Sequence, residues 1–334
     1  MTVDGGTALG EATSDGGAVG AYLDHLDRVD PEGATRLVLD LLDRGWSVAD
    51  VLVDVVSVAQ REIGRRWLTG GWSVAQEHAA THVSEQVVAA VGRRTGRSAG
   101  RGHVVLACVE GEWHALAARI VAEVVRASGW RVTFLGASVP PRHLVSYLHQ
   151  TGPDAVLVSC VQPSRLVRAA RMIEACRATG VPVVAGGPGF GAGGRWATAV
   201  GAAACGASAR DAVELLDRHG HLASAGEPAP PPPDDEHVAV LRRRREVVQG
   251  VTRALVPAGA DADPVADATA QVLDSLAAAL LVGDPELLDE FVRWQRQALG
   301  TRDSLLDAIL AGCATALTEH PRAIRYLRLV GADG

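Results

Sequence analysis

The sequence predicts an α/β domain between two all-helical regions, and three changes in apolar spacing predict it. Apolar residues recur at helical spacing over residues 18–95 and again over 237–330. Between them, short apolar runs alternate with helical segments. A length of 334 residues accommodates about two or three domains. We therefore expect a disordered tail (1–17), a four-helix bundle (18–97), a parallel-sheet domain (101–221), a Pro-rich linker (222–236) and a C-terminal helical domain (237–330).

The composition indicates a soluble, mildly acidic globular protein. Hydrophobic residues make up 48% of the chain, charged residues 21%, and the net charge is −7. This acidic balance argues against a protein that coats nucleic acid. We find no apolar run near the roughly 18 residues of a membrane-spanning helix, and the Gly-, Ala- and Asp-rich start does not resemble a signal peptide. The expected location is therefore the cytoplasm, with no membrane partner.

All 32 residues in the Lys+Arg count are arginine, so the chain contains no lysine. This excludes pyridoxal enzymes, lysine aldolases and P-loop proteins, which need a lysine amine. The five cysteines are widely spaced and form no C-x-x-C pair, which favours buried free thiols over a zinc site or a disulfide framework.

Each helical region is predicted from its own stripe of apolar residues. In the first region, residues 33–42, 48–67 and 77–91 carry such stripes, and glycines 45, 70 and 71 separate them. In the last region, the stripes span 237–255, 264–281, 285–299 and 304–319. Pro264 and Pro285 stand where a helix start tolerates proline. Pro230 to Pro233 make the preceding segment a stiff, extended linker.

The central region alternates strands and helices. The expected strands are 103–109, 131–135, 155–160, 181–185 and 202–205. The expected helices are 113–128, 142–151, 166–179 and 208–218. This alternation predicts a flavodoxin-like parallel sheet with helices on both faces, in which ligands bind beyond the carboxyl ends of the strands.

A chemically distinctive loop follows the first expected strand. It contains Glu112, Trp113 and His114, and His114 stands at the start of the next helix. A neutral imidazole is a good ligand for cobalt, iron or zinc, and Glu112 could hold its second nitrogen. The alternative is that His114 is an ordinary polar residue of an exposed loop.

Three loops together resemble the cobalamin-binding domain family, which carries D/E-x-H-x-x-G, then S-x-L, then G-G. The matching residues are Glu112, His114 and Ala117, then Ser159 and Val161, then Gly186 and Gly187. The resemblance implies that His114 is the lower axial cobalt ligand and that Ser159 contacts the nucleotide tail of the cofactor. It also implies that Gly186 and Gly187 let the backbone approach that tail. Ala117 and Val161 depart slightly from the family pattern.

The first helical region resembles the cap of the CarH photoreceptor family in its Trp67-x9-Glu77-His78 spacing. The resemblance implies that Trp67, Glu77 and His78 cover the adenosyl group of adenosylcobalamin, with Val74 nearby. The alternative is a core tryptophan and an ordinary Glu-His pair. Residues 1–20 cannot hold the DNA-reading domain of that family, so no direct DNA binding is expected. Leu68 replaces the histidine that ligates cobalt after illumination, which leaves water, His78 or His82 for that role.

The order of the three domains resembles the photocobilins, whose C-terminal globin-like domain binds a bilin. The resemblance implies biliverdin held without a covalent bond. The polar and aromatic groups available for it are Arg242 to Arg245, Arg293, Trp294, Arg296, His320, Arg322, Arg325 and Tyr326. The alternative for the Arg242 to Arg245 run is a solvated helix surface.

These observations predict a light-responsive adenosylcobalamin photoreceptor, not an enzyme, that forms homo-oligomers and signals to a downstream protein of unknown identity. Two alternatives stay open: a corrinoid methyl carrier of a methyltransferase system, and a cobalamin sensor without photochemistry. A carrier exposes its cobalt to two partner proteins, whereas the large Trp67 and the Glu77-His78 pair favour an enclosed adenosyl group.

Overall fold

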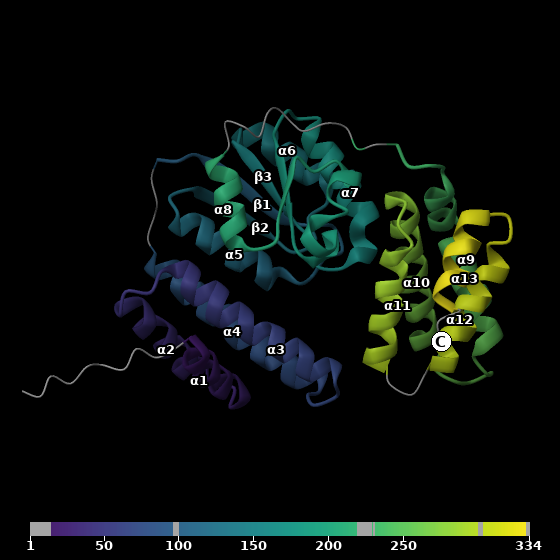
Figure 1. Ribbon diagram of the computed structural model, residues 1–334, viewed down its shortest axis with the longest axis horizontal. Coiled ribbons are helices and arrows are strands. Elements are labelled where there is room, and N and C mark those ends of the chain that lie inside the picture. The colour runs from purple at the N-terminus through teal and green to yellow at the C-terminus, as the bar shows by residue number, and fades with distance from the viewer. Residues whose placement is uncertain (1–14, 96–99, 219–228, 230, 300–302, 332–334) are drawn as a thin grey trace, which may run out of the picture. The chain divides into compact units, whose positions relative to one another are not determined.

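The computed structural model describes residues 15–95, 100–218, 229, 231–299 and 303–331 (Figure 1). It divides into two compact units, residues 1–67 with 71–94, and residues 68–70 with 95–334. Most of the predicted tail (1–17) lies outside the described residues, and residues 15–17 begin the first helix. Most of the predicted Pro-rich linker (222–236) also lies outside them.

The first unit is a small helical bundle, as the apolar stripes predict. Its helices are α1 (Asp15–Asp27), α2 (Pro31–Asp43), α3 (Ser57–Leu68) and α4 (Val74–Arg94). A seven-residue π-helical segment, η1 (Asp50–Val56), leads directly into α3. The amide and the hydroxyl of Ser57 both donate to the carbonyl of Leu52, five residues earlier, and so complete the wider turn. Sequence periodicity predicts one continuous helix here, because the π-segment keeps its apolar residues on the buried side.

The second unit contains a five-stranded parallel sheet in the order β2-β1-β3-β4-β5, which is flavodoxin-like as expected. The strands are β1 (His103–Cys108), β2 (Arg131–Gly136), β3 (Ala155–Ser159), β4 (Val183–Gly186) and β5 (Ala204–Gly206). The central strand β1 is buried along its whole length, which explains its unbroken apolar run.

Four helices cover the two faces of the sheet (Figure 1). They are α5 (Ala115–Ala127), α6 (Pro141–Thr151), α7 (Leu166–Arg177) and α8 (Ala209–Asp217). Helices α5 and α8 pack together over one hydrophobic core, and α6 and α7 pack together over the other.

The C-terminal bundle contains one helix more than the four predicted stripes. Its helices are α9 (Glu236–Leu255), α10 (Asp263–Val282), α11 (Glu286–Leu299), α12 (Asp303–Ala316) and α13 (Pro321–Gly331). The predicted stripe over 304–319 ends early at Ala316, and Pro321 then opens α13. Helix α13 buries Ala323, Tyr326, Leu327 and Val330 at helical spacing.

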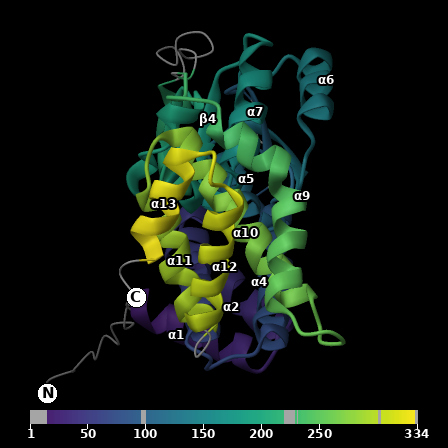
Figure 2. The same ribbon diagram turned by 90° about the vertical axis from the view of Figure 1, so that its right-hand side faces the viewer.

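Helix α10 is the centre of this bundle and packs against α9, α11, α12 and α13 (Figure 2). Within the described part of the chain, it is the one helix whose length and composition would let it cross a membrane, and most of it is buried inside the protein. It also contacts α7 and two short 3-10 turns, η2 (Pro163–Arg165) and η5 (Thr198–Val200). One hydrophobic core therefore runs from the α6/α7 face of the sheet into the bundle.

Candidate functional site

The predicted site residues of the α/β domain lie along the carboxyl edge of the sheet. Cys108, Ser159, Gly186 and Gly206 are the last or near-last residues of four adjacent strands and pair with one another in register. The sheet thus brings Ser159 beside Gly186, as the loop pattern requires. Sequence reasoning missed Gly206, although it directly follows the last expected strand.

Glu112 and His114 form a close polar contact at this edge. The Glu112 side chain is only 1% exposed, and its Oε1 atom lies 2.6 Å from Nδ1 of His114. The same oxygen accepts the backbone N–H of His114 at 3.1 Å. Its Oε2 atom accepts the backbone N–H groups of Val161 and Gln162 at 2.9 and 3.1 Å. Glu112 therefore ties the loop after β1 to the loop after β3.

These contacts determine the ionisation of Glu112. Burial by itself would raise the pKa of Glu112, but the hydrogen bonds from His114 and Val161 outweigh it and lower the pKa to about 2. The carboxylate is therefore charged at neutral pH and accepts a hydrogen bond from Nδ1–H of His114. Because Glu112 accepts from Nδ1, we assign the tautomer of His114 that is protonated at Nδ1. In this tautomer, Nε2 has the lone pair that can bind a metal.

His114 has the features of a metal-ligating histidine. It precedes the first residue of α5, its side chain is 59% exposed, and a buried carboxylate orients its ring. A neutral imidazole with a carboxylate behind it suits cobalt as well as zinc. The donor set therefore fits the cobalamin that the loop motifs imply. The neighbouring Trp113 side chain projects into solvent and is 72% exposed.

The glycine pair after β4 meets the protein's own backbone. Gly187 has a φ of +104°, and a Cβ at this position would lie 2.4 Å from the carbonyl oxygen of Cys160. The same carbonyl accepts the N–H of Gly189 at 3.0 Å. At Gly186, a Cβ would lie 3.4 Å from the carbonyl oxygen of Gly206, an ordinary contact distance. Gly187 is thus required for the packing of the loops after β3 and β4.

A polar cavity of about 250 Å³ lies beside the loop after β1, and sequence reasoning missed it. Glu110, Pro141, Arg168 and Arg171 line it. An Nη atom of Arg168 approaches the carbonyl of Glu110 at 3.4 Å. The cavity is smaller than the roughly 300–1,000 Å³ of common ligand sites. Its two arginines are one helical turn apart on α7, a spacing that the sequence displays.

In the first unit, two of the four predicted residues, Glu77 and His78, are the outer end of a hydrogen-bond chain. Trp67 is half-buried, Val74 and His78 are exposed, and Nδ1 of His78 lies 2.5 Å from the half-buried Glu77 carboxylate. Thr81 donates to the other oxygen of Glu77 at 2.9 Å. The chain continues through Gln60 and Ser84 to the buried hydroxyl of Tyr22. Sequence reasoning missed these four residues, although Thr81 and Ser84 share a face of α4 with Glu77.

Most of the cations suggested for a bilin pair with carboxylates inside the C-terminal bundle. The pairs are Arg243–Glu246, Arg244–Asp274, Arg293–Asp289, Arg296–Asp307 and Arg322–Asp234. Arg325 stacks over Tyr326, at 5.6 Å from its ring centroid. Arg242 and Arg245 are exposed on α9, as the solvated-surface alternative predicts. His320 lies between α12 and α13, and Trp294 packs beside Phe291 with ring centroids 6.3 Å apart.

Two family models match the chain, and both describe a B12 binding domain. One covers residues 102–217, which contain the sheet, and the other covers residues 20–91, which contain the first helical bundle.

Several curated proteins are similar to the same part of the chain. A corrinoid protein of Desulfitobacterium hafniense is 27% identical over 186 residues, which are 54% of this chain and 83% of that protein. Trimethylamine corrinoid protein 1 of Methanosarcina acetivorans is 23% identical over 202 residues, 58% of this chain and 92% of that protein. The HTH-type transcriptional repressor CarA of Myxococcus xanthus is 33% identical over 131 residues, 39% of this chain and 44% of the repressor.

Among solved structures, the monomethylamine corrinoid protein of Methanosarcina barkeri matches with a TM-score of 0.54 and 16% identity. The match covers 61% of this chain and all of that one. At this identity, the match supports the fold alone.

Proposed function

Because residues 20–91 and 102–217 form a cobalamin-binding module, we propose that this chain is an adenosylcobalamin-dependent light sensor. It is a carrier or a sensor and not an enzyme, and the C-terminal bundle is the observation that supports a sensor. The bundle lies outside both matched regions, yet it shares one hydrophobic core with the α/β domain. A sensor needs a second module that responds to the state of its ligand, whereas a carrier does not.

In this proposal, the carboxyl edge of the sheet holds the lower side of the cofactor. His114 ligates cobalt through Nε2, while Glu112 keeps the proton on Nδ1 and fixes the ring. Ser159, Gly186 and Gly187 receive the nucleotide tail. The backbone N–H of Val161 contributes indirectly, because it anchors Glu112. When bound, adenosylcobalamin supplies a cobalt–carbon bond that light breaks.

The first helical bundle supplies the cover of the upper side. Trp67, Val74, Glu77 and His78 form this cover, and Trp113 belongs to the cofactor-binding loop after β1. The exposure of Val74 and His78 within their own unit supports this assignment, because both side chains are accessible to a ligand. The similarity to the repressor CarA supports a regulatory role. Leu68 has no ligating atom, so after illumination water, His78 or His82 would have to coordinate the cobalt.

A second candidate function is that of a corrinoid methyl carrier. The observation that favours it is the similarity to the trimethylamine corrinoid protein over 92% of that protein's length. In that case the C-terminal bundle docks a methyltransferase and does not transmit a signal. A third candidate function is that of a cobalamin sensor without photochemistry.

The C-terminal bundle carries the other part of the proposal, a biliverdin bound without a covalent bond. Its propionates would have to compete with carboxylates for Arg244 and Arg322, or bind the exposed Arg242 and Arg245. Protein purified from cells that make biliverdin should then carry a red-absorbing band. A purified protein without this band would remove biliverdin from the proposal and leave the cobalamin part untouched.

The deciding experiment compares the protein with adenosylcobalamin in the dark and after green light. Any bound adenosylcobalamin is photolabile, so the readout must be the protein: its oligomeric state and the hydrogen exchange of the C-terminal bundle. We expect both to change with light and to stay unchanged in Trp67→Ala. Protein loaded with hydroxocobalamin is the matched control, because it lacks the adenosyl group.

Two outcomes would contradict the light-sensor proposal. If light changed neither readout, but both differed between cofactor-free and loaded protein, the protein would be a sensor that detects binding alone. If neither readout changed and a methyltransferase could methylate the bound cofactor, the carrier reading would replace it. His114→Ala tests the site itself, since unchanged affinity and an unchanged spectrum would disprove cobalt ligation by His114.

A further inference from the structure

The loop that follows the glycine pair has an unusual backbone that requires external support. Residues 187–201 form three short 3-10 turns, η3 (Pro188–Phe190), η4 (Ala192–Gly194) and η5. Five of its glycines have positive φ angles, at Gly187, Gly191, Gly193, Gly194 and Gly201. Because glycine loses the most conformational freedom on ordering, this loop needs strong contacts to keep one shape.

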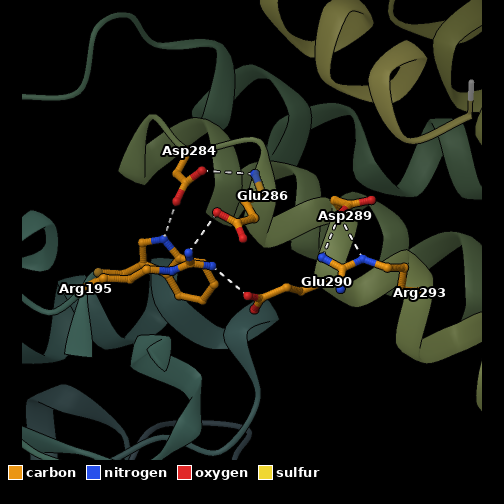
Figure 3. A network of polar contacts seen from close by, with 7 residues as sticks. Arg195, Asp284, Glu286, Asp289, Glu290 and Arg293 are labelled. Carbon is orange, nitrogen blue, oxygen red and sulfur yellow. Dashed lines mark hydrogen bonds and ion pairs between the residues drawn. The ribbon is translucent and has the colours of Figure 1, made fainter. Parts of the chain in front are cut away.

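Two adjacent side chains of the loop provide such contacts, and both reach the C-terminal bundle. The Arg195 guanidinium forms ion pairs with Glu286 at 2.8 Å and with Glu290 at 2.6 Å (Figure 3). The Trp196 side chain is 2% exposed, and its Nε1–H donates to Asp284 at 2.8 Å. The guanidinium also stacks over the indole ring, 4.5 Å from the ring centroid.

All three acceptors belong to one short stretch of the bundle, the turn after α10 and the start of α11. Asp284 uses its second oxygen to accept the N–H of Glu286 and so orders the first turn of α11 (Figure 3). The loop is therefore held to the bundle by two ion pairs and by one hydrogen bond from a buried indole to a carboxylate. The contacts join residues 88 to 95 positions apart, so they exist only if the bundle is docked.

We propose that Arg195 and Trp196 are positioning residues through which the C-terminal bundle holds the loop in the shape that receives the nucleotide tail of cobalamin. This inference rests on the proposed function, in which Gly186 and Gly187 receive that tail. By linkage, a bundle that stabilises the tail-binding shape is itself stabilised when the tail binds. The loop is thus the route by which occupancy of the cofactor site reaches the bundle.

The test changes the bundle and leaves the loop sequence intact. The double variant Glu286→Gln/Glu290→Gln removes both charges that Arg195 contacts. Asp289→Asn is the matched control, because Asp289 lies on the same helix and pairs with Arg293 instead (Figure 3). The probes are hydroxocobalamin and cobinamide, which keeps the corrin ring but lacks the nucleotide tail. Both dissociation constants are measured on the full chain in the dark.

We expect the double variant to bind hydroxocobalamin about three- to tenfold more weakly, the effect of losing two partly exposed ion pairs. Its cobinamide affinity should equal that of the wild type, and Asp289→Asn should match the wild type for both probes. In the cofactor-free protein, hydrogen exchange over residues 187–201 should be faster in the double variant than in the control.

The outcomes separate this inference from the proposed function. If the wild type bound hydroxocobalamin and the double variant bound it equally well, the inference alone would fail. An equal loss for hydroxocobalamin and cobinamide, or the same loss in Asp289→Asn, would also overturn it, because the effect would then be general. A wild type that bound neither probe would overturn both the inference and the proposed function.

Discussion

Nδ1 of His114 lies 2.6 Å from the buried Oε1 of Glu112, so the ring orientation of the proposed cobalt ligand depends on a single carboxylate. That carboxylate is anchored in turn by two backbone N–H groups of the loop after β3. These contacts fix His114 to the carboxyl edge of the sheet, even though its side chain is exposed.

Glu112→Gln should weaken cobalamin binding about 10- to 100-fold, the usual effect of losing an orienting partner of a ligating histidine. The amide has only one oxygen, so its NH₂ group must face either the ring N–H or the backbone donors. The measurement is the dissociation constant, together with the nitrogen coupling in the electron paramagnetic resonance spectrum of bound Co(II). Glu110→Gln is the control, since it makes the same charge change two residues away; equal effects would refute the role of Glu112.

The same carboxylate should make the cofactor-free protein acid-sensitive. Its pKa is lowered from 4.5 to about 2 on folding, so its contribution is fully present above pH 4.5 and is lost as the pH falls toward 2. At pH 7 this contribution is about 3 kcal/mol. Urea unfolding of the wild type and Glu112→Gln should differ by a constant amount above pH 5, and the gap should narrow below pH 4.5. A gap that did not vary with pH would contradict the lowered pKa.

Gly187→Ala should destabilise the second unit by more than about 2 kcal/mol, because strain in φ adds to a clash with the Cys160 carbonyl. Gly193→Ala is the matched control. Gly193 also has a positive φ, +63°, but a Cβ there meets nothing within 4 Å, so we expect about 1 kcal/mol. Chemical denaturation of both variants measures the difference, and equal losses would show that the close approach to Cys160 is unimportant.

Ser84→Ala should destabilise the first unit by about 2 kcal/mol. The Ser84 hydroxyl accepts from the buried Tyr22 hydroxyl at 3.0 Å and from the Gln60 amide at 2.6 Å, and both donors would lose their acceptor. Tyr22→Phe removes one of these donors, so the double variant should cost less than the sum of the two single changes. A double-mutant cycle from urea unfolding provides the test, and strict additivity would rule out the coupling.

The sequence by itself determined the architecture and the loops that matter. The five strands, their parallel sheet and the place of His114 after β1 follow from apolar periodicity and from the alternation of strands and helices, because these signals are local. The same signals missed the π-helical segment and α13, since a π-turn keeps the apolar side and a short helix after Pro321 resembles a helix end.

Only the tertiary structure decided which groups hold the site together. Glu112 is anchored by Val161 and Gln162, some 50 residues away, and Gly187 is constrained by Cys160. Arg195 reaches Glu286 and Glu290 from a different part of the chain. Such contacts depend on which strands are neighbours and on how α10 packs against the sheet domain. No spacing along the sequence encodes them, because their energy arises only once distant segments are buried together.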